Sequence, residues 1–243
     1  MNNLKKNYLL RSIKILDLND HSEKTSDVLI NNGKIKLIKK RIEKKNFQGS
    51  KTKIFNCKDL VMCPGLVDMR VNINDASDEN ILNIQKVAAK SGIITLITLP
   101  NLNSILDNPT IIEHLYEKSK KVNMINILAY GAATQNLNGH NIAELGLMSK
   151  SGAIGFSDGI NCIQDSLIMR RVMDYAAMLK KPVIQHAEDK ALAGLTNASD
   201  TTIRGEMNES EMSTRLGLIG IPSCAEVIII ERDIRLAKLT GAH

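Results

Sequence analysis

The sequence predicts an α/β protein, an incomplete (β/α)8 TIM-type barrel of about five strand–helix units preceded by a small β-rich domain. Residues 7–62 contain short β-rich runs separated by Asn, Asp and Gly turn signals. From Pro64 onward apolar strands alternate with helical patterns, which is typical of a parallel sheet. The predicted domains are therefore residues 1–63 and residues 64–243.

The first domain is predicted to be a small antiparallel β unit with strands at residues 8–16, 28–30, 34–38, 53–55 and 60–62. In residues 34–45 Lys and Arg alternate with Ile and Leu, the pattern of a strand with one solvated face. We interpret these charges as solvated surface rather than a nucleic-acid-binding patch, because no aromatic residues interleave with them.

The second domain has predicted strands at residues 66–73, 93–99, 125–133, 153–157 and 182–186, and predicted helices at 78–91, 110–121, 141–151, 166–180 and 223–240. Several strands end in polar residues, among them Asn101, Asp158 and His186, at the edge where barrels carry their sites. An open doubly wound sheet is the alternative, but no G-x-G-x-x-G loop follows the first strand. Five units leave an unpaired edge strand, so we expect a fragment or a completing partner.

Composition excludes several classes of protein. The chain is 43% apolar with 3% aromatic residues and no Trp, so aliphatic side chains must form the core. The four cysteines include no C-x-x-C pair, and no signal-like or membrane-spanning apolar stretch occurs. We therefore expect a cytoplasmic, reduced protein without a nucleic-acid or membrane partner, and a structural role for Cys162 in preference to a nucleophilic one.

A series of motifs covers nearly the whole chain. They are P-G-L-V-D-M-R-V-N from Pro64, T-L-P-N from Thr98 with D-N-P from Asp107, F-S-D-G from Phe156, M-R-R from Met169, H-A-E-D from His186, the run from Met207 to Pro222, and E-R-D-I-R-L-A-K-L-T-G-A from Glu231. In this order they resemble the dihydroorotase family of the amidohydrolase superfamily. Each piece alone is weak, but together they are specific.

The resemblance implies an activity and a set of site residues. Dihydroorotases interconvert carbamoyl-aspartate and dihydroorotate in pyrimidine synthesis, using zinc to activate water. The resemblance implies that His186 and Asp158 occupy metal positions, Asp158 as the remnant of an acid that bridges the metals. It also implies that Asn101 occupies a substrate-binding position. The family pattern P-G-x-x-D-x-H-x-H is broken, since Arg70 and Asn72 replace its histidines. Asn74 replaces the substrate-binding Arg that follows, and the remaining ligands would lie beyond His243.

With M-R-V in place of the histidine motif, the sequence resembles the inactive dihydroorotase homologues that accompany aspartate carbamoyltransferase in some bacteria. This resemblance implies a non-catalytic protein with no catalytic residue, no cofactor unless some zinc is retained, and aspartate carbamoyltransferase as its partner. A homo-oligomer is a further expectation. One hypothesis is that the cationic Arg70 repels a metal and pairs instead with Asp158 or Asp68. The alternative is an active zinc-dependent dihydroorotase or related cyclic-amide hydrolase.

Two other interpretations stay open. The chain could be an incomplete gene product with no stable role alone, and the same residues could have purely structural roles. His186 could be a hydrogen-bonded core histidine, Asp158 a turn or N-cap residue, and Asn101 a partner of backbone groups. Residues 189–222 are predicted to form a long loop that is functional or mobile.

Overall fold

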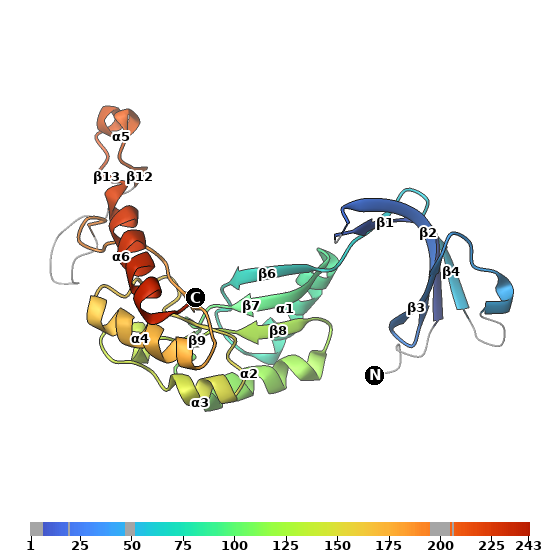
Figure 1. Cartoon of the computed structure of the whole chain (residues 1–243), viewed down its shortest axis with the longest axis horizontal. Coiled ribbons are helices and arrows are strands. Elements are labelled where there is room, and N and C mark those ends of the chain that lie inside the picture. The colour runs from blue at the N-terminus through green and yellow to red at the C-terminus, as the bar shows by residue number, and fades with distance from the viewer. Residues whose placement is uncertain (1–6, 19, 47–51, 195–204, 206) are drawn as a thin grey trace. The chain divides into compact units, whose positions relative to one another are not determined.

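The computed structural model describes residues 7–18, 20–46, 52–194, 205 and 207–243. The chain divides into two compact units, Met1–Gly65 and Leu66–His243, a division beside the predicted boundary after residue 63. Each unit is described by itself, and Figure 1 shows the elements of both. The expected α/β architecture is confirmed.

The first unit is a mixed five-stranded sheet. Its strands are β1 (Asn7–Asp17), β2 (Ser22–Asn31), β3 (Lys34–Lys39), β4 (Thr52–Asn56) and β5 (Val61–Met62). The strands β1, β2 and β3 pair antiparallel, as predicted, but β4 and β5 both pair parallel with β1. The expectation of a wholly antiparallel unit is wrong, because the chain crosses from β3 at one edge, by way of the 3-10 turn η1 (Lys44–Asn46), to the far side of β1.

Both faces of this sheet carry a small core. Val28 and Leu29 are adjacent in β2 and buried, and they belong to two different hydrophobic clusters. Since neighbouring residues of a strand point to opposite faces, one cluster lies on each side. Leu9 and Ile42 complete one cluster, and Ile13 and Cys57 complete the other.

The second unit holds the predicted parallel strands and their helices. In chain order they are β6 (Leu66–Val71), α1 (Asp78–Lys90), β7 (Ile93–Thr98), α2 (Pro109–Val122), β8 (Asn126–Ala129), β9 (Gly131–Ala132), α3 (Leu145–Lys150), β10 (Phe156–Ser157), α4 (Ser166–Met178) and β11 (Val183–Ile184), with α6 (Cys224–Thr240) near the end. The strands form two parallel sheets, β6-β7-β8 and β9-β10-β11. Strand–helix alternation of this kind is the first part of a (β/α) barrel.

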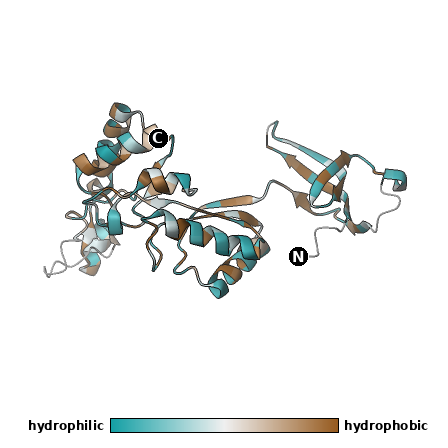
Figure 2. Ribbon diagram, turned by 90° about the horizontal axis from the view of Figure 1, so that it is seen from below, coloured by the Kyte–Doolittle hydropathy of each residue, from teal (hydrophilic) through white to brown (hydrophobic). Residues whose placement is uncertain are grey.

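The helices begin where local capping residues dictate. The Asn108 side chain accepts a hydrogen bond from the backbone of Ile111, and Pro109 takes the first helical position of α2. The Asp165 side chain caps α4 in the same way. Figure 2 shows brown and teal on the same helices, as expected for helices with one face toward a core. That core includes the fully buried Phe156 and Met169.

The segment predicted as a long loop, 189–222, is partly regular. It contains β12 (Met207–Asn208), α5 (Glu211–Leu216) and β13 (Gly220–Ile221), with β12 and β13 paired in parallel. Residues 195–204 and 206 lie outside the described residues. Within the described part of the chain, no helix is long and apolar enough to cross a membrane.

Candidate functional site

The candidate site lies where parallel strands of the second unit end. The residue after β6 is Asn72, and His186 follows β11 at the other end of the series; Asn101, Thr134 and Asp158 follow the strands between them. Because the strands are parallel within each sheet, their carboxyl ends share one edge. Asn101 lies at this edge of the first sheet, and Asp158 and His186 lie at this edge of the second; Asn101 is next to Gly159, the residue after Asp158.

Asn72 and Asn101 interact directly. The Asn101 side-chain amide donates a hydrogen bond to the side-chain oxygen of Asn72 at 3.1 Å. The Asn101 oxygen is buried and has no hydrogen-bond partner among the described residues. It lies so close to Gly159 that a Cβ atom added there would be 2.9 Å from it, and Gly159 also has a φ of +67°. Glycine is needed at this position for both reasons.

Asp158 is held by the segment that follows β9. Its carboxylate accepts hydrogen bonds from the backbone N–H of Thr134 at 2.9 Å and from the Thr134 hydroxyl. The exposed fractions of Asp158 and Thr134 are 1% and 0%. Burial raises the pKa of Asp158 above its usual 3.8, and the Thr134 hydrogen bonds oppose that rise. Both carboxylate oxygens are thus occupied by the protein itself.

His186 is more accessible than Asp158. About a third of its side chain is exposed, and its Nε2 atom lies 3.8 Å from a carboxylate oxygen of Glu188. This separation is longer than a hydrogen bond. The His186 imidazole is therefore accessible to a ligand from solution and is not held by a hydrogen bond to Glu188.

The expected ion pair of Arg70 is wrong. Arg70 is exposed, and among the described residues its guanidinium makes no ion pair with Asp158 or Asp68. The Asp68 side chain instead accepts a hydrogen bond from the Arg70 backbone N–H at 3.1 Å. A register shift in β6 between Asp68 and Val71 marks a bulge at this point, and Thr134 already occupies Asp158.

A second cluster fixes the chain beside His186. Arg232 of α6 donates hydrogen bonds to the backbone oxygens of Ile163 and Gln164, at 2.9 and 2.8 Å, and pairs with Asp233 at 2.8 Å. The Gln164 side chain donates to the backbone oxygen of Glu188 at 2.8 Å. Through these contacts α6 holds together the segments that follow β10 and β11.

Cys162 belongs to the same neighbourhood and is buried, as expected of a structural cysteine. Burial raises the pKa of its thiol, which disfavours the nucleophilic thiolate. The Gln185 side-chain amide lies 3.3 Å from its sulfur. All four cysteines are free thiols.

The residues at the strand ends do not fit a zinc ion. Catalytic zinc is held by about three imidazole, carboxylate or thiolate ligands. Arg70 has no lone pair to offer, and the Asn72 amide oxygen accepts a hydrogen bond from Asn101, so Asp158 and His186 are the remaining imidazole or carboxylate groups at these strand ends. Over the described ranges no three His, Cys, Asp or Glu residues are grouped so that they could hold a metal.

The family assignment follows from comparison with known sequences. The model of the family described as Dihydro-orotase-like matches residues 59–243. The chain belongs to this family. It is 35% identical over 237 residues to a dihydroorotase of Endomicrobium trichonymphae and 33% identical over 232 residues to one of Aquifex aeolicus. These two matches cover 96% and 94% of this chain. It covers 52% and 51% of those relatives, so it spans about half the length of the curated relatives it matches.

Solved structures agree on the fold. L-hydantoinase (dihydropyrimidinase) from Arthrobacter aurescens matches with a TM-score of 0.72 at 18% identity, over 97% of this chain and 51% of that one. Dihydropyrimidinase from Brevibacillus agri matches with a TM-score of 0.66 at 16% identity, over 98% and 50%. At this identity the likeness establishes the fold of the dihydroorotase-like chain and not its chemistry.

Two residues of this dihydroorotase-like site were missed by sequence reasoning. Thr134 carries no motif, and nothing in its neighbourhood indicates that it binds a carboxylate 24 positions away. Arg232 lies in the motif from Glu231, which gave a signal of family membership but no role. Its hydrogen bonds to two backbone carbonyl groups supply that role.

Proposed function

We propose that this dihydroorotase-like protein of pyrimidine biosynthesis does not hydrolyse cyclic amides and acts as a structural partner of aspartate carbamoyltransferase. The observation that carries the proposal is the end of β6. Arg70 and Asn72 stand there where the family pattern has two histidines, and the Asn72 side chain is engaged by Asn101 at 3.1 Å.

The charges at this edge support the loss of metal chemistry. The Arg70 guanidinium is permanently cationic and repels a divalent cation nearby. A neutral carboxamide such as Asn72 is a poor zinc ligand beside the imidazole it replaces. At Asp158 the two hydrogen bonds from Thr134 already stabilise the carboxylate without a metal. Without a metal there is no activated water for the hydrolysis.

The partner role is supported by the contrast between the retained fold and the altered site. The chain has the fold of amidohydrolase structures, with capped helices and a fixed α6, while Arg70, Asn72 and Asn74 replace metal and substrate residues of the family pattern. Aspartate carbamoyltransferase makes carbamoyl-aspartate, on which dihydroorotases act, so a retained scaffold has a natural place beside it.

Coexpression of the whole protein with aspartate carbamoyltransferase of the same cell tests both parts. We expect a complex that is stable in size-exclusion chromatography, and no dihydroorotate hydrolysis above the rate of a buffer blank. The His186→Ala variant is the matched control, and it should form the same complex with the same stoichiometry. Turnover of dihydroorotate that His186→Ala abolishes would contradict inactivity, and separate elution of the two proteins would contradict the partner role.

A further inference from the structure

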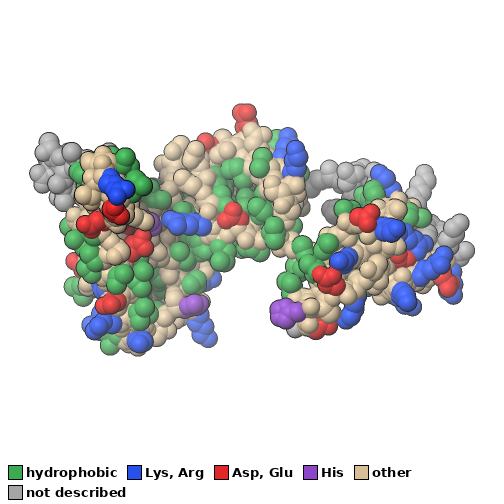
Figure 3. Space-filling model, turned by 90° about the horizontal axis from the view of Figure 1, so that it is seen from above, with side chains coloured by type: hydrophobic (Ala, Val, Ile, Leu, Met, Phe, Trp, Pro, Cys, Tyr) green, Lys and Arg blue, Asp and Glu red, His purple; other side chains and the backbone are tan. Residues whose placement is uncertain are grey.

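We propose that strand β3 of the N-terminal unit binds an extended acidic segment of another protein by strand addition. The inference does not depend on the proposed function, because every residue it uses lies in the first unit. Its first support is the distribution of charge. Residues 1–65 contain 15 Lys and Arg against six Asp and Glu, whereas residues 66–243 contain 17 against 20. The small unit therefore carries the whole positive excess of the chain, and Figure 3 shows Lys and Arg side chains gathered on it.

The acidic groups of this unit are mostly already paired with other cations. Asp27 is bound to Arg11, and Asp20 lies 3.4 Å from Lys24. Glu23 pairs with Lys14 at 3.0 Å, and Glu43 with Lys45 at 2.7 Å. For Asp27, burial raises the pKa, but hydrogen bonds from Ile42, Ser12 and Arg11 outweigh it and leave the pKa lowered, which favours the ionised form. These acids are therefore not free to neutralise the lysines of β3.

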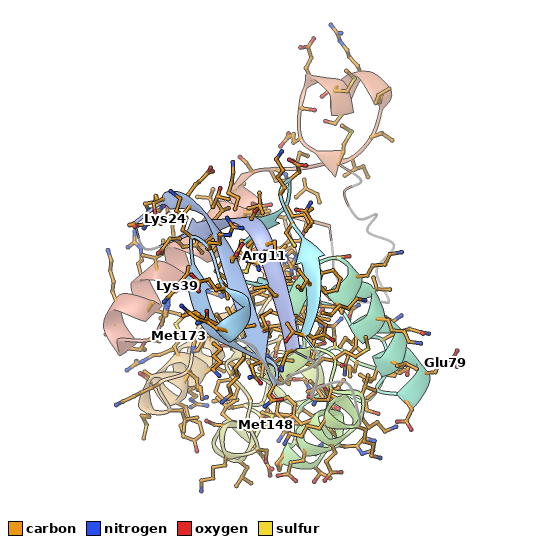
Figure 4. All side chains as sticks on the ribbon, turned by 90° about the vertical axis from the view of Figure 1, so that its right-hand side faces the viewer. Arg11, Lys24, Lys39, Glu79, Met148 and Met173 are labelled. Carbon is orange, nitrogen blue, oxygen red and sulfur yellow. The ribbon has the colours of Figure 1, made fainter. Side chains whose placement is uncertain are left out.

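The cations of β3 have no ion-pair partner among the described residues. Lys34, Lys36 and Lys39 are exposed, and so are Lys40 and Arg41, which follow directly. Figure 4 labels Lys39 at the end of this strand and Lys24 on the same sheet. Five like charges on so short a segment repel one another, so an anionic partner would bind with a favourable electrostatic free energy.

The strand is also an edge. In the sheet order β3-β2-β1-β4, β3 pairs with β2 on one side, with a register shift that leaves Lys36 without a partner residue in β2, and no described strand pairs with its other side. Lysines on edge strands commonly prevent pairing with other chains. That role does not account for Ile35 and Ile38, which are 57% and 47% exposed on the same strand. A cationic edge that also exposes apolar side chains is suited to a specific occupant.

The occupant is identified by these features. Its backbone would pair with the free edge of β3, and its side chains would alternate between acidic residues beside the lysines and apolar residues beside Ile35 and Ile38. Nucleic acid is a poorer match, because binding of unpaired strands relies on aromatic side chains for stacking. Phe55, the exposed aromatic residue of this sheet, lies on β4 at the opposite edge, with the Lys53 ammonium 4.9 Å from its ring centre.

The test is a binding titration of the whole protein with a short fluorescent peptide of alternating Glu and Val. We expect binding that weakens about tenfold in the triple variant Lys34→Gln, Lys36→Gln, Lys39→Gln, as the loss of three cross-strand charge pairs implies. The matched control neutralises Lys86, Lys120 and Lys150, which are exposed in the second unit and make no ion pair there among the described residues. Its affinity should stay within about twofold of the unchanged protein, because it alters net charge but not β3.

Amide hydrogen exchange in the same complexes gives an independent readout, with new protection expected in Lys34–Lys39. Four results would overturn the proposal: no peptide binding, equal weakening in both triple variants, protection confined to other strands, or tighter binding of a single-stranded oligonucleotide with the same charge. Failure here would leave the assays of dihydroorotate hydrolysis and complex formation unaffected.

Discussion

Replacement of Thr134 by Val should destabilise the second unit through the loss of two hydrogen bonds. Val has nearly the shape of Thr but lacks the hydroxyl group. That hydroxyl donates to the buried carboxylate of Asp158 and accepts from the Gly139 backbone N–H at 2.9 Å. Thr134 is fully buried, so water cannot replace either bond without a structural change.

The expected cost follows from these contacts. A hydrogen bond to a charged group contributes about 1.5–3 kcal/mol, and an N–H group left unpaired costs about 1 kcal/mol or more. We therefore expect the free energy of unfolding to fall by roughly 2–4 kcal/mol. Thr134→Ser, which keeps the hydroxyl and removes one methyl group, should cost only about 1 kcal/mol. The loss of the Thr134 donor should also raise the pKa of Asp158 further, since that bond lowers it.

Urea unfolding of the whole protein, followed by far-UV circular dichroism, measures these differences. The reasoning requires Thr134→Val to be clearly less stable than Thr134→Ser. If Val is as stable as Ser, or more stable, the hydroxyl does not hold the Asp158 carboxylate, and the account of the site is refuted at this point.

Three further changes test other contacts. Folding raises the pKa of Asp158, so the folded protein binds the proton more tightly than the unfolded chain. The contribution of this group to the free energy of unfolding is therefore greatest below pH 3.8 and is lost as pH rises through the folded pKa. Asp158→Asn should remove this pH dependence from the urea midpoint. Gln85→Met should lower the free energy of unfolding by about 2–4 kcal/mol, because the buried amide of Gln85 donates to Ser119 and accepts from the backbones of Met124 and Ile125. The control Lys86→Met, on the exposed face of the same helix, should change it by less than about 0.5 kcal/mol. Arg232→Met should cost about 2–4 kcal/mol, because the partly buried Asp233 loses its cation and the Ile163 and Gln164 carbonyl groups lose a donor. Adding Asp233→Asn should recover part of the loss, and a double variant no more stable than Arg232→Met would contradict this pairing.

Local signals made the helices predictable. The helix expected at 78–91 is found at Asp78–Lys90, and the one expected at 166–180 at Ser166–Met178. Both begin after a residue whose side chain caps the first turn, Ser77 and Asp165. A capping side chain acts within three residues of its own position, so the sequence carries this information directly.

Strand partners depend on distant residues and were less predictable. The single strand expected at 125–133 is divided into β8 and β9, because the chain changes partner there. The Tyr130 backbone N–H donates to the oxygen of Thr98, and the next N–H, of Gly131, donates to the oxygen of Gly155. A mainly hydrophobic run gives no sign of such a change, since seven of its nine residues are Ile, Leu, Ala or Gly.

The site residues were located by motif, but their contacts could not be read from the sequence. The hydrogen bond between Asn72 and Asn101 spans 29 positions, and that between Thr134 and Asp158 spans 24. The charge-based expectation for Arg70 failed: Arg70 is exposed, whereas Asp158 is buried and accepts its hydrogen bonds from Thr134, a polar group without charge. Coulomb attraction alone does not determine which partner a buried carboxylate finds.

The zinc content of the purified whole protein is the measurement that tests the central claim most directly. Protein prepared in zinc-containing medium, and then passed through a desalting column, would be assayed by mass spectrometry beside the His186→Ala variant. The account predicts zinc far below one ion per chain in both proteins, since Arg70, Asn72 and the occupied Asp158 do not form a zinc site. Stoichiometric zinc that disappears in His186→Ala would contradict the account and would favour the alternative, an active zinc-dependent hydrolase.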